Sequence, residues 1–173
     1  KKPPVDKTWV SIKDYFTKQG DGFTTEIGTF SVPEASTIRK FIAPEDQWPI
    51  NDVWHYHDLH TNNQNLEGYL HTADSLYGVS NSLDDFNRKI QLINYDSHRA
   101  IFEAWNNKLW NNSSGVLLWM SHPAWPSMIW QTYSWDFQTH GSFYGSKKGC
   151  EPLHIQLNLH NNQVIAVNTS LNN

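Results

Sequence analysis

Glu26 is the residue of this sequence whose type and position best suit covalent chemistry. It lies near the end of the run 23–27, a short apolar and β-branched stretch that predicts a strand ending at Gly28. In barrel-type α/β domains the active site forms at the carboxyl ends of the strands. A carboxylate placed there can attack the anomeric carbon of a sugar as a nucleophile. The alternative is a solvated glutamate at a strand end, which for an arbitrary glutamate is the stronger interpretation.

Aromatic side chains follow a second predicted strand at the corresponding place. Trp119 lies at the end of the apolar run 115–120, and His122 and Trp125 come shortly after it. The chain of 173 residues contains Trp 9, Tyr 7 and Phe 8. Flat rings either fill a core or stack on the flat faces of sugars, and composition does not choose between the two. We expect these three residues to line a sugar pocket, with a core tryptophan as the alternative for Trp119.

Three histidines at alternate positions, His55, His57 and His60, could converge on a metal ion. No cysteine or carboxylate stands near them at the spacing of a known metal motif, so we expect no metal. Hydrogen bonding to a ligand, or a satisfied position in the core, suits these histidines better, and we expect His57 to contact substrate. The sequence also has no glycine-rich phosphate loop and no nucleophilic serine motif, and no cofactor is expected.

Hydrophobic periodicity predicts the elements that must position these residues. In chain order they are a strand at 23–27, helices at 33–44, 66–77 and 82–110, a strand at 115–120, and a hairpin made of 153–159 and 164–167. The rest of 44–81 and the aromatic stretch 121–144 are expected to be loops. The run 115–120 is continuously apolar and bounded by Gly115 and Pro123, which predicts a strand that is buried on both faces.

The order of strand, helix, loop, long helix and strand is typical of an α/β fold with parallel strands. Two strands cannot close a barrel or make a stable parallel sheet. The sequence therefore predicts the end of a larger α/β domain. The hairpin that follows alternates with a different period and favours the beginning of a separate all-β domain.

Composition excludes several functional classes. The formal net charge of -4 leaves no basic stripe for binding nucleic acid. No apolar run approaches the length of a membrane span. Hydrophobic residues make up 38% of the chain and charged residues only 17%, so the chain should pack a core rather than stay disordered.

Several motifs, in order along the chain, resemble the catalytic domain of family 2 glycoside hydrolases. The matching segments are 23–28, 32–33, 37–39, 48–54, 82–86, 115–120, 124–127, 144–148 and 151–156. The resemblance covers nearly the whole chain, from about residue 22 to 169. In detail these motifs look most like the exo-β-D-glucosaminidase branch, with the plant endo-β-mannosidase branch close behind. They are specific for the family and much less specific for the substrate.

The resemblance implies an architecture. Residues 1–150 would form the C-terminal portion of a (β/α)8 TIM barrel, and residues 151–173 the first β-hairpin of an immunoglobulin-like β-sandwich domain. Glu26 matches the family's nucleophile, and Trp119 matches the ring that packs beside the attacked sugar. Trp54 lies in a matching segment and is expected, like His57, to contact substrate.

The resemblance also implies a retaining mechanism, in which two carboxyl groups stand roughly 5–5.5 Å apart. The family's acid/base normally stands in an Asn-Glu pair, and this sequence contains no such pair. The pairs that end in Glu67 and Glu103 lie in or beside predicted helices and do not fit. We therefore expect the acid/base to lie outside this chain. Because proton transfer contributes roughly 10²–10⁴-fold to such reactions, the isolated chain should be inactive.

The expected partners are a β-linked oligosaccharide and the remaining segments or chains of the same enzyme. Family habit favours a secreted, periplasmic, or lysosome- or vacuole-like location, and glycosylation sequons occur at Asn111, Asn112 and Asn168. Two alternatives stay open. The chain could bind glycans without chemistry, or it could belong to a degenerate relative that has kept Glu26 and lost the acid/base.

Overall fold

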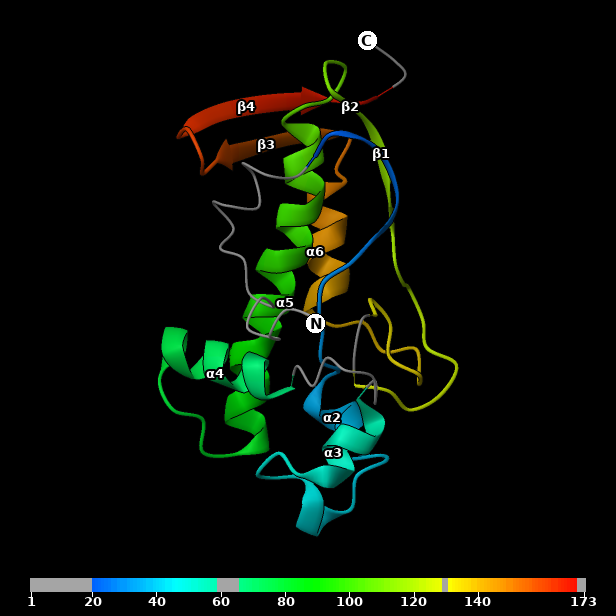
Figure 1. The fold of residues 1–173 in the computed structure, drawn as a ribbon, viewed down its shortest axis with the longest axis vertical. Helices are drawn as coiled ribbons and strands as arrows, with labels where there is room; N and C mark the ends of the chain where they lie inside the picture. The colour runs from blue at the N-terminus through cyan, green and yellow to red at the C-terminus, as the bar shows by residue number, and fades with distance from the viewer. Residues whose placement is uncertain (1–19, 59–65, 129–130, 171–173) are drawn as a thin grey trace, which may run out of the picture.

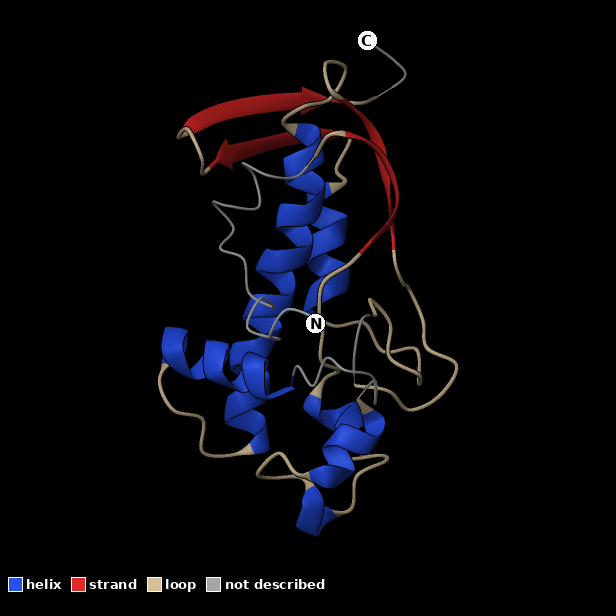
Figure 2. Ribbon diagram, viewed as in Figure 1, coloured by secondary structure: helices blue, strands red, loops and turns tan. Residues whose placement is uncertain are grey.

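A computed structural model describes residues 20–58, 66–128 and 131–170. Its centre is the helix α5 (Leu83–Asn106), with α6 (Gly141–Gly149) alongside it (Figure 1). The parallel strands β1 (Gly22–Ile27) and β2 (Ser113–Leu118) run beside this helix pair. The hairpin of β3 (Leu153–Asn158) and β4 (Gln163–Asn168) crosses one end of α5. Helices and strands both contribute, which makes this a mixed α/β fold (Figure 2).

Four short helical elements gather at the other end of α5. They are α2 (Ala35–Ile38), the 3-10 helix η1 (Pro44–Asp46), α3 (Asp52–His57) and α4 (Leu66–Tyr77). The prediction of α4 is confirmed at both ends. The helix predicted over 33–44 is reduced to one turn, α2. The helix α3 was wrongly expected to be loop, because six residues are too few to establish a helical period.

The long helix α5 forms where its hydrophobic stripe and its cap predict it. Ser82 caps it by accepting a hydrogen bond from the backbone N–H of Asp85, and the acidic residues of the first turn suit its positive end. Its buried stripe includes Phe86, Ile90 and Ile101. The helix ends at Asn106, short of the predicted end near residue 110.

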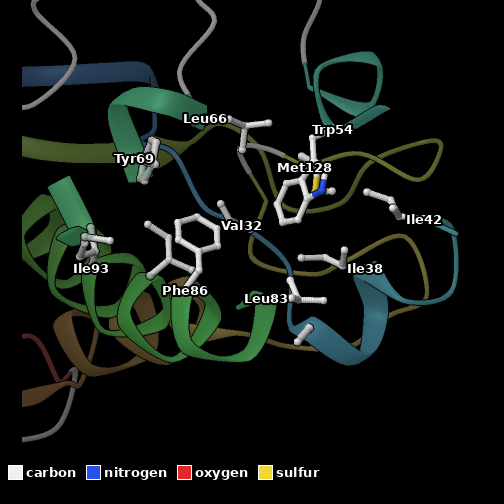
Figure 3. Close-up of a cluster of buried hydrophobic side chains, with 13 residues drawn as sticks. Val32, Ile38, Ile42, Trp54, Leu66, Tyr69, Leu83, Phe86, Ile93 and Met128 are labelled. Atoms are coloured by element: carbon white, nitrogen blue, oxygen red, sulfur yellow. The ribbon is translucent and has the colours of Figure 1, made fainter. Parts of the chain in front are cut away.

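The main hydrophobic core lies between α5 and the short helices. Phe86 of α5 meets Trp54 of α3 there, with ring centroids 6.1 Å apart. Figure 3 shows this cluster, whose buried members include Val32, Ile38, Ile42, Trp54, Leu66, Tyr69, Leu83, Phe86, Ile93 and Met128. A second cluster joins Ala100, Ala104 and Trp105 of α5 to Ile27 and Val116 of the two parallel strands. In the described part of the chain, α5 thus holds the sheet from one side.

The expectation that 115–120 is buried on both faces is wrong for the described residues. Val116 packs toward α5, but Leu117 is 54% exposed. Among the described residues this sheet has two strands, and α5 packs against one of its faces. Consecutive strand residues point to opposite faces, so the side chains that alternate with Val116 lie on the uncovered face.

The helix α6 falls partly within the stretch 121–144 that was expected to be loop. Three glycines, Gly141, Gly145 and Gly149, lie four residues apart on its face toward α5. A β-carbon at Gly145 would lie 2.1 Å from the backbone oxygen of Tyr95. Because glycine has no side chain, the backbones of α5 and α6 can touch. The same glycines lower helix propensity, so the sequence pattern did not predict this helix.

The predicted hairpin is confirmed, but its polarity is the reverse of an ordinary surface hairpin. On β3, His154, Gln156 and Asn158 are buried against α5, and the residues that alternate with them are exposed. Gln156 Nε2 donates a hydrogen bond to the backbone oxygen of Glu103 at 2.7 Å. The opposite side is called here the outer face; its apolar residues are Leu153, Ile155, Leu157, Val164 and Ala166, all exposed. The hairpin therefore holds the helix by polar contacts and turns its apolar side outward.

Candidate functional site

The parallel pairing of β1 and β2 is irregular at Glu26. Thr24 pairs with Val116 and Ile27 pairs with Leu118, so three steps along β1 match two steps along β2. The strand β1 carries one extra residue at this point, which is a β-bulge containing Glu26. A bulge re-aims side chains and is common beside active sites. Glu26 is exposed, and it lies at the carboxyl end of its strand as predicted.

The ends of the two strands are fastened together directly after the bulge. The backbone N–H of Trp119 donates to the oxygen of Ile27 at 2.7 Å. A β-carbon at Gly28 would lie 2.1 Å from the backbone oxygen of Trp119, so only glycine permits this approach. Trp119 is 50% exposed. The structure thus brings Glu26 and Trp119 to the same end of the sheet, each with its side chain accessible.

The loops that follow the two strands are joined by a buried hydrogen-bond network. The backbone N–H of Gln131 donates to Ser31 Oγ at 2.8 Å, and the Ser31 hydroxyl donates to the backbone oxygen of Gln131. The Ser142 hydroxyl donates to the same oxygen at 2.7 Å. The start of α6 is therefore tied to both loops, which fixes the loops relative to the strand ends.

Two buried histidines, His98 of α5 and His140 before α6, lie at the edge of this network. The Nδ1 atom of His140 is 2.8 Å from Ser142 Oγ, and that of His98 is 3.0 Å from the backbone oxygen of Asn94. Burial lowers the pKa of His98 to about 4 and the pKa of His140 to about 3, the latter also because His98 stands nearby. Both rings are therefore neutral at neutral pH, and they support the loops rather than exchange protons there.

A series of contacting aromatic rings leads from the core to the surface beside these loops. Phe41, which packs against the core, lies 4.7 Å from the His57 ring, and His57 in turn stacks on Trp125 at 5.5 Å and 25°. Tyr56 meets Trp125 edge-on at 6.0 Å and 85°. His57 Nδ1 lies 2.7 Å from the Pro126 carbonyl oxygen. The structure therefore brings two of the predicted residues, His57 and Trp125, into direct contact.

His122 lies in a different contact of the same loop. Its ring stacks on Phe137 with centroids 4.5 Å apart and planes 15° apart, and Phe137 is 74% exposed. The ring nitrogen Nε2 of His122 is buried and has no hydrogen-bond partner among the described residues. The ring of His122 is thus held by Phe137.

The expectation that Trp54 contacts substrate is corrected by its position. Trp54 is 0% exposed, and its indole nitrogen donates to the backbone oxygen of Asp46 at 2.9 Å (Figure 3). The ring fills the main core against Phe86. A ring with no accessible face cannot stack on a sugar, so Trp54 acts here by building α3 and thereby placing His57.

Neither glutamate considered as an acid/base is free for that role. Glu103 is buried between Arg99, whose Nε lies at 2.6 Å, and His154, whose Nε2 lies at 2.9 Å. Glu67 Oε1 lies 2.6 Å from His55 Nε2 on the surface of α4. Among the described residues no three His, Cys, Asp or Glu side chains form a group that could hold a metal, and His60 lies outside those residues.

Comparisons with known proteins show what the chain is similar to. The chain matches no protein-family model. The mannosylglycoprotein endo-β-mannosidase of Lilium longiflorum is 35% identical over 86% of this chain and 17% of its own length. The exo-β-D-glucosaminidase of Hypocrea jecorina is 31% identical over 87% of this chain and 18% of its own length. The exo-chitosanase CsxA of Amycolatopsis orientalis superposes with a TM-score of 0.83 at 28% identity, over 92% of this chain and 20% of that one.

The chain belongs to family 2 of the glycoside hydrolases. Its relatives are named exo-β-D-glucosaminidases and β-mannosidases, which confirms the branch predicted from the motifs. The β-D-mannosidase of Dictyoglomus thermophilum shares the fold with a TM-score of 0.81. This family 2 chain spans 17% and 18% of the length of the first two relatives, so it corresponds to a small part of each. In the described part of this family 2 chain, no helix has the length and apolar character of a membrane span.

Proposed function

We propose that this chain is the part of a retaining β-glycosidase that carries the catalytic nucleophile, Glu26. The observation that supports the proposal is the β-bulge at the carboxyl end of β1, which presents an exposed Glu26 beside Trp119. The names of the relatives suggest the substrate class. We therefore propose a β-linked glucosaminide or mannoside as the substrate.

In the proposed reaction a Glu26 oxygen attacks the anomeric carbon and forms a glycosyl-enzyme ester. The bond from that carbon to the leaving oxygen breaks, and the leaving oxygen takes a proton from a carboxylic acid outside this chain. Water then attacks the anomeric carbon and gives a proton to the carboxylate outside this chain, which has just lost its own proton. The bond from that carbon to Glu26 breaks, and Glu26 is free again. The second carboxyl should stand roughly 5–5.5 Å from Glu26. The Trp119 ring packs beside the attacked sugar, and His122 lines the same pocket.

The proposed architecture accounts for the uncovered face of the sheet. Residues 1–150 are proposed to be the C-terminal portion of a (β/α)8 barrel, whose interior is filled by side chains from all the strands. The exposed Leu117 and Trp119 would then face neighbouring strands that lie outside this chain. Residues 151–173 are proposed to begin an immunoglobulin-like β-sandwich domain. The partners are the remaining segments of the same enzyme, and the isolated chain should be inactive.

The compartment is proposed from the habit of the family. A secreted, periplasmic, or lysosome- or vacuole-like location would suit a glycosidase of this branch. The three sequon asparagines, Asn111, Asn112 and Asn168, are all exposed, so glycosylation is sterically allowed at each.

The experiment that tests the proposal compares Glu26→Gln with Glu45→Gln in the intact protein that contains this chain. Gln keeps the shape of the side chain but cannot form the glycosyl ester. Hydrolysis of aryl β-glucosaminide and aryl β-mannoside should fall roughly 10⁴-fold or more in Glu26→Gln while sugar binding is retained. Glu45 is an exposed residue of η1, and its variant should match the parent.

Mass spectrometry provides the covalent readout. Incubation of the parent with 2-deoxy-2-fluoro glycosides of gluco, manno and galacto configuration should add one fluorosugar to the peptide that contains Glu26. If none of the three reagents labels that peptide in an otherwise folded protein, Glu26 is not a working nucleophile. The chain would then fit the non-catalytic or degenerate alternative.

A further inference from the structure

Trp125 is held in a way that the attack at Glu26 does not require. Phe41, His57 and Trp125 form a continuous series of ring contacts that starts beside the core and ends at the half-exposed Trp125. The loop that carries Trp125 is also bonded to α3, since the backbone N–H of Met128 donates to the oxygen of His57 at 2.9 Å. An aromatic ring fixed in this way loses little conformational entropy when a ligand binds.

The exposed surfaces of two rings form a corner. Trp125 is 42% exposed, Tyr56 is 61% exposed, and their planes meet at 85°. The imidazole of His57 covers one face of the indole, and the accessible surface of the indole lies away from it. A flat ligand with an apolar face and a polar edge suits such a corner, because its face can stack on the indole while its edge stays in water.

We propose that the Trp125–Tyr56 corner binds a second pyranose unit of the oligosaccharide, other than the unit that Glu26 attacks. This inference rests on the proposed function and adds a separate binding position to it. Trp125 follows Trp119 by six residues of the same loop, so the two lie at most about 20 Å apart. One oligosaccharide can therefore reach both positions, and the corner would favour long substrates over short ones.

The test uses the intact protein and compares two substrates in Trp125→Ala. For a tetrasaccharide of β-linked glucosamine or mannose, KM should rise roughly tenfold with kcat nearly unchanged, because a contact made equally in the ground and transition states is lost. For a short aryl glycoside of the same sugar, both constants should match the parent. Trp125→Phe, which keeps a stacking ring, should recover most of the tetrasaccharide KM.

Trp110→Ala is the matched control, since Trp110 is 78% exposed and precedes the amino end of β2, away from the strand ends that carry Glu26. Both substrates should behave as in the parent. If Trp125→Ala changes neither substrate, or changes both equally, the second binding position is overturned.

Calorimetric titration of the same tetrasaccharides into the Glu26→Gln protein separates this inference from the proposed chemistry. Adding Trp125→Ala to that protein should weaken binding roughly tenfold, whether or not the parent hydrolyses the sugar. Unchanged affinity would overturn the corner as a sugar site while leaving Glu26 as nucleophile. If the parent hydrolyses no glycoside but the titration shows the loss, the corner stands and the proposed chemistry fails.

Discussion

His98 and His140 show how single buried residues support the site without touching it. Each is about 1% exposed, and burial lowers the pKa of both rings well below the ordinary value of 6.5. The unfolded chain therefore binds more protons than the folded one at mildly acidic pH. Their contribution to stability is complete above pH 6.5 and is lost as the pH falls from 6.5 toward 4, by up to about 1.4 kcal/mol per pH unit for each histidine.

We expect the free energy of unfolding to fall steeply between pH 6.5 and 4.5 in urea titrations. In His140→Asn the slope over this range should be smaller, because one of the two titrating groups is gone. His71→Asn is the control, since His71 is exposed on α4, and its slope should equal that of the parent. An equal slope in His140→Asn and the parent would show that His140 is not held neutral in the folded protein.

At the scale of single residues, the sequence predicted the positions of some site residues correctly and misplaced others. Glu26 and Trp119 were placed correctly at one end of the sheet, because a strand end is visible in the sequence as a run that stops near glycine or proline. Trp54 was expected to contact substrate, because an indole in a polar stretch has the same sequence signature whether it is exposed or buried. Burial of Trp54 depends on Phe86, 32 residues further along the chain, and no local pattern reports that contact.

At the scale of elements, α6 is stabilised by packing that overrides propensity. A Gly-to-Ala change in an exposed helix stabilises it by about 1 kcal/mol. In Gly145→Ala the new methyl group would meet the backbone oxygen of Tyr95 at 2.1 Å, so α6 would have to move away from α5. We expect a net loss of about 1–3 kcal/mol in the free energy of unfolding, measured by urea titration.

Lys147→Ala in the same helix is the control for that prediction, since Lys147 is exposed and its change should stay within about 0.5 kcal/mol. A gain in stability in Gly145→Ala would mean that the two helices have room to spare. The same packing explains why the sequence predicted α5 and not α6. The stripe of α5 is long and apolar, whereas α6 contacts its neighbour through glycines, which carry no hydrophobic signal.

For the whole molecule, the outer face of the hairpin is the feature that bears on the proposed β-sandwich. Its apolar side chains are exposed in this chain, with Ile155 at 69%. If further strands cover that face in the intact protein, Ile155→Ser should lower the free energy of unfolding by about 2–4 kcal/mol. Val79→Ser provides the comparison, because Val79 is 79% exposed in the loop after α4.

Thermal unfolding of the intact protein measures both variants. A loss in Ile155→Ser no larger than that in Val79→Ser would show that the outer face stays open, against the proposed sandwich. The sequence predicted the hairpin from local alternation, and it predicted the two parallel strands from short apolar runs that stop near glycine or proline. It did not predict which face of the hairpin meets α5, since that choice is made by the polar contacts of Glu103 and Asn107 with Gln156 and Asn158.

The bulge at Glu26 has a consequence for length variation among related chains. Removing Thr25 would take the extra residue out of β1, so Glu26 would pair with Leu117 and its carboxylate would lose the direction that the bulge sets. Exchanging Thr25 for another β-branched residue would keep the count and the direction. This segment should therefore accept changes of residue type but no gain or loss of a residue. The four-residue connection between β3 and β4, at the surface, should accept both.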